Sequence, residues 1–155
     1  MKIAYVLSHI SEVYAGVPIA TRKLGCALIK LGIDVSFWTT GDQDEARILE
    51  NVGITPHIFP RKWLHGWRYS PDFTSVLNKK ISEFDLVHIH EAWSYPQLAA
   101  AQAALRHKIP YIWAPRASLE PWRMRYKGWK KLLYFKLFGK RIMSHAFCMH
   151  AVAGA

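Results

Sequence analysis

The sequence predicts an α/β fold, a Rossmann-like open parallel sheet of about six strands with helices on both faces. Short apolar runs without polar alternation recur along the chain, which is typical of strands covered on both faces. A longer segment with apolar residues at helical spacing follows most of these runs. Strand and helix alternating in this way give a parallel sheet with right-handed crossovers. The 155 residues match the length of one domain, so we expect a single unit over residues 1–155.

The first strand is expected at residues 3–7 (IAYVL), an uninterrupted apolar run. The first helix is expected at 17–31, because its apolar residues recur at helical spacing and Gly32 follows in the usual C-cap position. The other expected strands are 35–40, 54–59, 85–90, 110–114 and 145–152. The other expected helices are 44–53, 72–84, 95–108 and a basic helix from about Pro121, a residue that suits a first turn.

Charge is distributed unevenly along the chain. Residues 1–91 hold ten Lys or Arg and ten Asp or Glu, whereas residues 92–155 hold eleven Lys or Arg and one acid, Glu120. The second segment therefore carries the whole formal charge of +10. Asymmetry of this kind indicates attraction to something anionic, which includes lipid head groups, nucleic acid and phosphorylated substrates.

Targeting signals and cysteine usage indicate a cytoplasmic protein. No apolar run approaches the ~18–20 residues that a spanning helix needs. The N-terminal MKIAYVLSHI is too short, and continues too polar, to be a signal peptide. Cys26 and Cys148 are isolated thiols without a CxxC spacing, as expected in a reducing compartment.

Ligands of an open parallel sheet bind at the carboxyl ends of its strands, near the point where the strand order reverses. This rule selects the loops at 8–16, 39–42, 90–95 and 115–120. The first loop lacks GxGxxG and no acidic residue ends the second strand, which disfavours an NAD-type dehydrogenase. Ala15-Gly16 precedes a helix whose backbone N–H groups can approach a diphosphate closely; the alternative is that the glycine only makes a tight turn.

Two histidines, His88 and His90, stand two apart on the fourth expected strand and so point to the same face. No third His or Cys follows at ligand spacing, so we expect no metal site. Either one of them faces a cleft at the strand end, or both are packed in the core.

Several segments together resemble the N-terminal domain of family 4 (group 1) glycosyltransferases, which are retaining enzymes of the GT-B fold. They are the MKIAYVLSHI strand, the small-Gly turn before a long helix, DLVHIHEAW at the fourth strand, and PRASLEPWRMRYKGWKKLLYFKLFGKR after the fifth. The resemblance covers essentially the whole chain and is most specific at 114–146. Such enzymes build bacterial exopolysaccharide, O-antigen and other glycoconjugates.

The resemblance implies two Rossmann-like domains that close over a cleft, the first receiving a glycan or lipid-linked acceptor and the second a nucleotide-sugar. No cofactor is implied besides this donor substrate. By position, Ala15, Gly16 and Val17 match the turn that approaches the donor phosphates. The residues expected on the acceptor side are His90, Glu91, Trp93, Arg116 and Ser118, with the insertion at 61–68.

Arg116 falls where many members of the family have His. A guanidinium donates hydrogen bonds but does not deprotonate in proteins, so a general-base role for Arg116 is doubtful, whereas contact with a phosphate fits. The catalytic residues stay unassigned.

In enzymes of this family, the donor-binding half consists of roughly another domain of chain. We therefore expect this chain to be an excised or truncated N-terminal domain that is inactive alone. A partner subunit of a two-chain transferase is the alternative. A nucleic-acid-binding module is disfavoured, because no helix-turn-helix, RNP or zinc pattern is present.

The basic segment 122–141 separates into two faces at 100° per residue. One stripe is expected to pack on the core and contains Trp122, Tyr126, Trp129, Leu133 and Leu137. The other arc contains Arg123, Lys127, Lys130, Lys131 and Arg141, with Tyr134 and Phe138 among them. This arc is either solvated or docks on anionic lipid, and we favour peripheral association with the inner face of a membrane.

Overall fold

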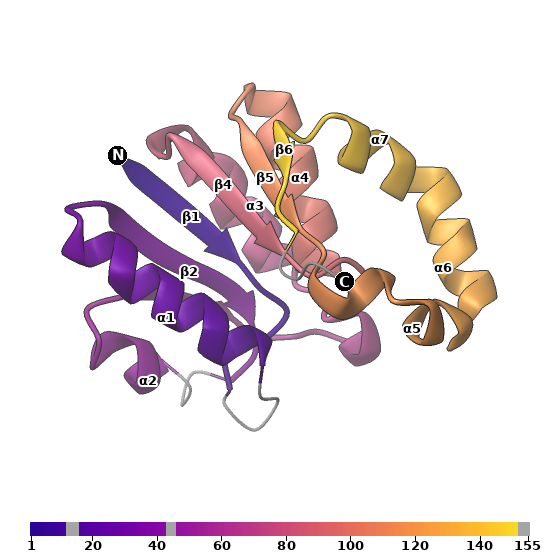
Figure 1. Cartoon of the computed structure of the whole chain (residues 1–155), viewed down its shortest axis with the longest axis horizontal. Coiled ribbons are helices and arrows are strands. Elements are labelled where there is room, and N and C mark those ends of the chain that lie inside the picture. Colours follow the sequence, from indigo (N-terminus) through magenta and orange to yellow (C-terminus); the bar gives the residue numbers. More distant parts are fainter. Residues whose placement is uncertain (12–15, 43–45, 152–155) are drawn as a thin grey trace.

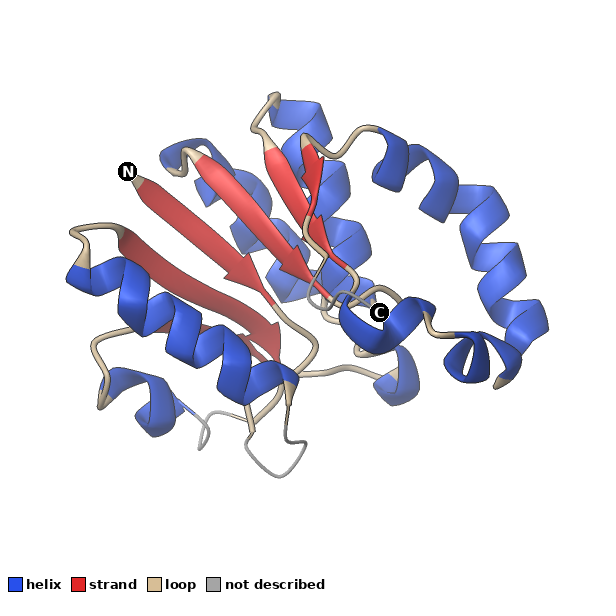
Figure 2. Cartoon of the chain, in the orientation of Figure 1, coloured by secondary structure: helices blue, strands red, loops and turns tan. Residues whose placement is uncertain are grey.

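The computed structural model describes residues 1–11, 16–42 and 46–151. Its sheet is six-stranded and parallel, in the order β3-β2-β1-β4-β5-β6, and helices cover both faces (Figures 1 and 2). The strands are β1 Lys2–Val6, β2 Asp34–Thr40, β3 Thr55–Phe59, β4 Leu86–His90, β5 Tyr111–Ala114 and β6 Cys148–Met149. The predicted fold class is confirmed, with a sixth strand shorter than expected.

Four of the helices begin at residues that favour helix starts. Ser70 caps one of them by accepting the backbone N–H of Phe73 at 3.3 Å, and prolines occupy the first turns of four. The α-helices are α1 Val17–Lys30, α2 Ala46–Glu50, α3 Pro71–Lys80, α4 Tyr95–His107, α5 Pro121–Arg125, α6 Gly128–Tyr134 and α7 Lys140–Ser144. Short 3₁₀ turns are η3 His65–Trp67, η4 Ile81–Glu83 and η5 Arg116–Leu119, and η6 Phe135–Gly139 is π-helical.

Two apolar layers hold the sheet in place, one on each face. α1 and α2 cover the face on which Tyr5 and Phe37 are buried. α3 and α4 cover the face on which Trp38, Val87 and Trp113 are buried. Full burial of side chains of this size stabilises the fold by ~1.5–3 kcal/mol each, so the sheet is a firm platform for the loops at its ends.

The strand order reverses between β1 and β4. The chain runs from β1 outward through β2 and β3, and then returns to the other side of β1 for β4, β5 and β6. The carboxyl ends of β1 and β4 therefore bracket the point at which ligands of such sheets bind.

The basic segment differs from its predicted form, and the predicted core stripe is wrong. The exposed fractions are 64% for Trp122, 67% for Tyr126, 69% for Trp129, 50% for Leu133 and 61% for Leu137. Ile142 is buried instead, and Tyr134 packs on Trp93 with 5.6 Å between ring centres. The reason is that no single helix spans the segment.

Two interruptions divide that segment. Lys127 adopts a left-handed conformation with φ +52 between α5 and α6, and the π-helical turn η6 shifts the phase before α7. One continuous 100° projection therefore cannot identify the packed face. The hydroxyl of Tyr111 donates to the carbonyl of Ile142, which attaches α7 to the sheet.

Across the residues that the structure describes, none of the helices combines the length and apolar character that crossing a membrane requires.

Candidate functional site

A pocket of about 510 Å³ lies at the carboxyl edge of the sheet, between the start of α1 and the loop that follows β5. It brings together Gly16 and Val17, predicted to approach donor phosphates, and Arg116, predicted on the acceptor side. Ala15 lies outside the described residues. The full lining is Gly16, Val17, Ala20, Pro115, Arg116, Ala117, Glu120, His150 and Ala151.

The N-terminus of α1 faces this pocket. Gly16 is the N-cap residue, with φ +64 and ψ −91, and its carbonyl accepts the backbone N–H of Ala20 at 2.9 Å. No side chain of the described residues caps this end. First-turn N–H groups such as that of Val17 have no helical partner, and the helix dipole adds positive potential there. A Cβ placed on Gly16 would meet no heavy atom of the described residues within 4 Å, so these residues leave room for an anion at the backbone.

Arg116 supplies the side-chain charge of the pocket. Its guanidinium nitrogen lies 3.1 Å from Nδ1 of His90. Because arginine can only donate, Nδ1 accepts and the proton of the neutral imidazole resides on Nε2. Burial lowers the pKa of Arg116, and Tyr5 and Glu91 oppose that shift, so the guanidinium stays charged.

His90 is fully buried at the end of β4. Burial holds its pKa well below the ordinary value, and the nearby His88 and Arg116 add to the effect. Within the described part of the chain, Nε2 of His90 and Nε of Arg116 are buried without a hydrogen-bond partner. Buried polar atoms of this kind are normally satisfied.

Two loop residues at this edge have left-handed backbones. Arg116 has φ +54 and Glu91 has φ +68, conformations that cost a non-glycine residue ~1–3 kcal/mol. Around Glu91, the carboxylate accepts the N–H of Ser8 at 3.1 Å and the backbone N–H donates to Ala114 at 2.8 Å. Its carbonyl accepts the indole N–H of Trp113 at 2.8 Å. These contacts hold the strained loop in one conformation.

A row of aromatic rings continues behind Arg116. His88 lies 3.2 Å from His150, between Nε2 and Nδ1, and both histidines of β4 contact Tyr5 with ring centres 5.0 Å apart. Burial lowers the pKa of His88 to about 3, with His150 and Arg116 contributing. Burial raises the pKa of Tyr5 to about 12. At neutral pH, His88 and Tyr5 are therefore uncharged.

The sequence of the chain matches the glycosyl transferase 4-like domain over residues 15–155. The chain belongs to this family. A search of curated proteins finds no significant match.

Solved structures share the fold of this glycosyl transferase 4-like domain. HepE of Anabaena, in complex with UDP and glucose, is 13% identical with a TM-score of 0.62, covering 98% of this chain and 44% of HepE. MurG of Acinetobacter baumannii is 13% identical with a TM-score of 0.63, covering 99% and 41%. A putative UDP-N-acetylglucosamine 2-epimerase of Listeria monocytogenes is 18% identical with a TM-score of 0.60, covering 97% and 38%. The chain thus spans less than half the length of each.

Three predicted residues of the glycosyl transferase 4-like domain frame the pocket without lining it. The indole N–H of Trp93 donates to the carbonyl of the buried Ser118 at 2.8 Å, which ties the β4 loop to the β5 loop. Glu91 braces the same region through Ser8. Contact of these residues with an acceptor stays a prediction.

The 61–68 insertion lies beside the end of β2. Arg68 donates to the carbonyl of Thr40 at 3.1 Å, and the Thr40 hydroxyl donates back to the carbonyl of Arg68 at 3.1 Å. Trp63 is 75% exposed there and contacts Tyr69. Its role in an acceptor wall is likewise untested.

His150 was missed by the sequence analysis, although it lines the pocket. The position of His150 in the sequence could have identified it, because His150 follows β6 and therefore lies at the same edge of the sheet as His90. The five residues predicted to form a membrane face lie outside this pocket. Four are exposed, whereas Lys131 is half-buried and donates to the carbonyl of Arg123.

Proposed function

We propose that this domain is the N-terminal half of a glycosyltransferase that moves a sugar from a nucleotide-sugar to a glycan or lipid-linked acceptor, with retention at the anomeric carbon. The observation that carries the proposal is the pocket in which the open N-terminus of α1 at Gly16 faces the guanidinium of Arg116. Membership in the glycosyl transferase 4-like family supports the reaction class. The crystal structure of HepE with UDP and glucose supports a nucleotide-sugar as the donor.

In this reaction the leaving group is a nucleoside diphosphate whose negative charge grows as the glycosidic bond breaks. The backbone N–H groups at Gly16 and Val17 stabilise that charge, and the dipole of α1 adds to their effect. Arg116 contributes a fixed positive charge from the opposite wall. His90 is a positioning residue, because its Nδ1 orients the guanidinium of Arg116.

The acceptor is proposed to enter along Glu91, Trp93 and the 61–68 insertion, while the predicted acceptor residue His90 is buried and acts through Arg116. Exposed aromatic side chains suit stacking on the apolar face of a sugar ring, and Trp63 is one. The donor-binding residues would come from a second domain, so the domain alone is proposed not to turn over.

The location is proposed to be the cytoplasmic face of a membrane, in polysaccharide or glycoconjugate biosynthesis. The +10 charge, carried by residues 92–155, supports an anionic surface as a partner. The basic arc of Arg123, Lys127, Lys130, Lys131 and Arg141 is the part of the chain assigned to it, with nucleic acid not proposed as a partner.

The reaction class is tested with the two-domain enzyme and a panel of UDP-, GDP- and dTDP-sugars. Transfer to a glycan acceptor is followed by NMR of the anomeric proton. A product with the anomeric configuration of the donor is expected. A product of inverted configuration, or epimerisation of the donor without transfer, would contradict the proposal.

A further inference from the structure

The pocket between α1 and the loop after β5 contains a further polar side chain, which the proposed reaction leaves unused. His150 lines this pocket together with Gly16 and Arg116. Its backbone N–H donates to the carbonyl of the buried Trp113 at 2.8 Å, which continues the pairing of β6 with β5. The side chain is half-buried, so a ligand in the pocket can reach it without a change in the fold.

The register of the sheet explains why His150 stands close to the histidines of β4. His90 is paired with Ala114 of β5. The pairing of Ile112 with Cys148 places the residue two positions later, His150, in the same row as Ala114. Side chains in one row of a parallel sheet point to the same face, and Ala114 is small and buried. An imidazole at the end of β6 therefore shares a face with the two imidazoles of β4.

Each histidine of β4 anchors one polar side chain of the pocket. His90 accepts a hydrogen bond from Arg116 across 3.1 Å. In the same way, Nε2 of His88 lies 3.2 Å from Nδ1 of His150. The His88 ring is itself held in place, because its centre lies 4.1 Å from that of His90 and 5.0 Å from that of Tyr5. The two histidines thus have parallel roles, one toward the loop after β5 and the other toward the end of β6.

The contact between His88 and His150 determines which nitrogen of His150 a ligand can use. Burial lowers the pKa of His88 to about 3, so its ring is neutral at neutral pH. Because Nδ1 of His150 is engaged with His88, the nitrogen left for a ligand is Nε2. An anion only accepts hydrogen bonds, so Nε2 carries a proton when a phosphate contacts it. In the neutral ring Nδ1 then accepts, and Nε2 of His88 is its donor.

The other polar groups of the pocket favour an anion next to His150. Arg116 contributes a guanidinium, and the start of α1 contributes backbone N–H groups without helical partners. Among the described residues of the lining, Glu120 alone is a carboxylate, and it is exposed, so water screens its charge. The pocket therefore offers hydrogen-bond donors from α1, from the loop after β5 and from the end of β6.

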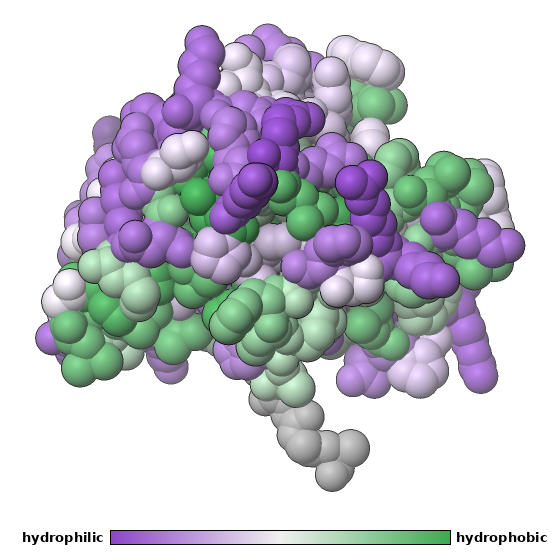
Figure 3. Space-filling view, turned by 90° about the horizontal axis from the view of Figure 1, so that it is seen from above, coloured by the Kyte–Doolittle hydropathy of each residue, from purple (hydrophilic) through white to green (hydrophobic). Residues whose placement is uncertain are grey.

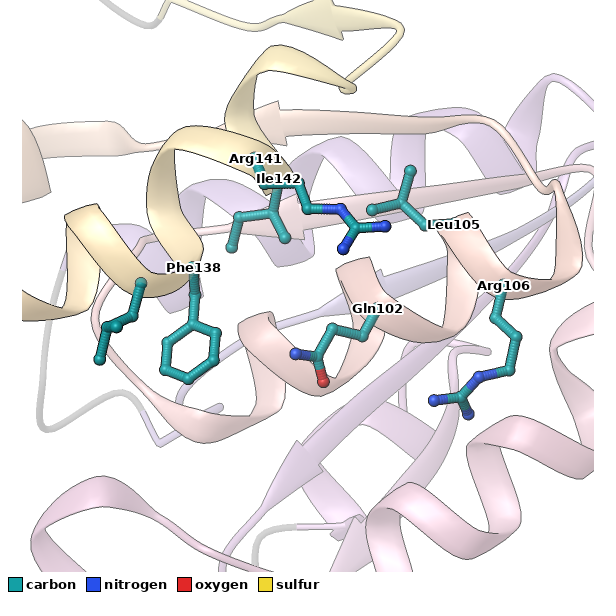
Figure 4. A pocket seen from close by; sticks show the side chains of 7 residues that line it. Gln102, Leu105, Arg106, Phe138, Arg141 and Ile142 are labelled. Atoms are coloured by element: carbon teal, nitrogen blue, oxygen red, sulfur yellow. The ribbon is translucent and has the colours of Figure 1, made fainter.

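Two other cationic regions of the described chain are built differently. A groove of about 550 Å³ between α4 and the η6–α7 segment is lined by Arg106, Arg141 and mostly apolar side chains (Figure 4). Hydrophobic and hydrophilic residues are interleaved at the right-hand end of the molecule in Figure 3, where α6 and α7 lie in Figure 1 and where Lys130 is exposed. An exposed lysine attracts an anion without fixing its orientation, whereas the anchored Arg116 and His150 can fix it.

We propose that His150 is a second side-chain ligand of the donor diphosphate, donating through Nε2 from the end of β6, and that His88 is the positioning residue that holds it. The inference rests on the nucleotide-sugar donor proposed above and names a further ligand for it. Arg116 and His150 then approach the diphosphate from two neighbouring strands, each fixed by one histidine of β4. Their hydrogen bonds stabilise the negative charge of the leaving group.

Isothermal titration calorimetry of the two-domain enzyme tests the contact, with whichever of UDP, GDP and dTDP the wild type binds most tightly. His150→Phe removes both ring nitrogens and should weaken binding by about tenfold or more, the effect of losing a hydrogen bond to a charged group. The affinity for the corresponding nucleoside, which has no phosphate, should change by no more than about twofold. His150→Gln should stay within about threefold of wild type, since its amide nitrogen can replace Nε2.

A double-mutant cycle tests the role of His88. His88→Leu should weaken the diphosphate by about threefold to fivefold, and adding it to His150→Phe should cause no further loss, because His88 acts through His150. His88→Gln keeps a donor at the position of Nε2 and should bind nearly as the wild type does. The ¹⁵N shifts of the His150 ring should show a proton on Nε2 in the wild-type complex. In His88→Leu part of the population should move to the Nδ1–H tautomer.

Matched controls lie outside the pocket. His145→Phe changes an exposed histidine of the same stretch of chain, and Arg141→Gln removes a cation from the groove between α4 and α7. Neither control should change the affinity for the diphosphate by more than about twofold. A tenfold loss in Arg141→Gln would place the diphosphate in that groove and overturn the inference. Circular dichroism spectra of all variants should coincide.

The remaining outcomes separate this inference from the proposed function. Wild-type affinity of His150→Phe, with weaker binding by Arg116→Gln, would overturn the role of His150 and leave the donor site in place. Equal weakening of nucleoside and diphosphate by His150→Phe would also overturn it, as would a His150 ring without a proton on Nε2 in the complex. Binding of none of the three diphosphates, or equal affinity of Arg116→Gln and wild type, would refute the donor site itself and the inference with it.

Discussion

Arg116 donates a hydrogen bond to Nδ1 of the buried His90 across 3.1 Å, joining the segment that follows β5 to the end of β4. The contact fixes both partners. His90 is held as a neutral ring with its proton on Nε2, and Arg116 is held at the wall of the pocket that faces the start of α1. The charged side chain of Arg116 and the N-terminus of α1 thus both line a pocket of about 510 Å³.

Removing the charge of Arg116 should impair transfer. In the two-domain enzyme, Arg116→Gln should lower kcat/KM by roughly 10²–10³-fold, the effect of losing one donor to developing negative charge. Arg116→Lys should retain part of the activity, because it keeps the charge but not the planar guanidinium. Steady-state kinetics measure both. Arg47→Gln, an exposed arginine on α2, is the control and should leave kcat/KM unchanged. Equal rates for Arg116→Gln and wild type would remove Arg116 from the reaction.

Substitution of Gly16 should lower both the stability of the fold and the affinity for UDP, for two separable reasons. Gly16→Ala puts a side chain at φ +64, which should cost ~1–2 kcal/mol of stability, and the added methyl group stands where an anion approaches the backbone. Gly53→Ala is the matched control, because Gly53 has φ +74 and an added Cβ there also meets open space. Urea unfolding should give similar losses of stability for the two variants. UDP affinity should fall only for Gly16→Ala, and an equal fall for Gly53→Ala would mean that strain alone is responsible.

Acid should destabilise the fold through its buried histidines. The pKa of His88 is lowered to about 3 and that of His90 is also held low, whereas unfolded histidine titrates near ~6.5. Below pH ~6.5 the unfolded chain binds more protons than the folded chain. The free energy of unfolding is therefore at its full value above pH ~6.5 and falls as the pH drops toward 3. The expected loss is roughly 1.4 kcal/mol per pH unit for each histidine.

Urea unfolding at pH values between about 7.5 and 5 measures this slope. In His88→Gln the slope should fall by the contribution of about one proton. A slope that is the same in His88→Gln and wild type would show that His88 is not buried in its neutral form.

The fold and half of the pocket could be predicted from the sequence because both depend on local patterns. β1 and β4 are apolar runs, and the rule for the carboxyl edge of a parallel sheet then selected Gly16, His90 and Arg116. The contact between Arg116 and His90 could not be predicted. It depends on the parallel pairing of β4 with β5 and on a left-handed backbone at Arg116, a conformation that arginine rarely adopts.

The basic segment shows where a periodic pattern fails. The spacing of Trp122, Trp129 and Leu133 predicts a packed face only if one helix runs through them. The left-handed Lys127 and the π-helical turn after Tyr134 change the phase, so that Tyr134 rather than Leu133 contacts the body of the protein. Interruptions of this kind depend on tertiary packing, which the spacing of apolar residues does not encode.

Close packing of α1 on the sheet should make Gly25 intolerant of larger residues. A Cβ at Gly25 would lie 3.2 Å from side-chain atoms of both Ile54 and Phe37. Gly25→Val should therefore destabilise the fold by ~1–3 kcal/mol through overpacking. Urea unfolding measures the loss, and a Gly25→Val variant as stable as wild type would show that α1 is more loosely packed. Gly25→Ala should be milder, since the stronger helix propensity of alanine offsets part of the clash.

The most direct test of the diphosphate site is a titration of the ¹⁵N-labelled two-domain enzyme with UDP, followed by amide chemical shifts. We expect the largest shifts at the backbone N–H groups of Gly16, Val17 and Ile19 and at Nε–H of Arg116, and we expect Arg116→Gln to weaken binding while Arg47→Gln does not. Shifts confined to the groove between α4 and α7 that Arg106 and Arg141 line, or none at Gly16 once the two-domain enzyme is saturated with UDP, would contradict a diphosphate site between α1 and Arg116.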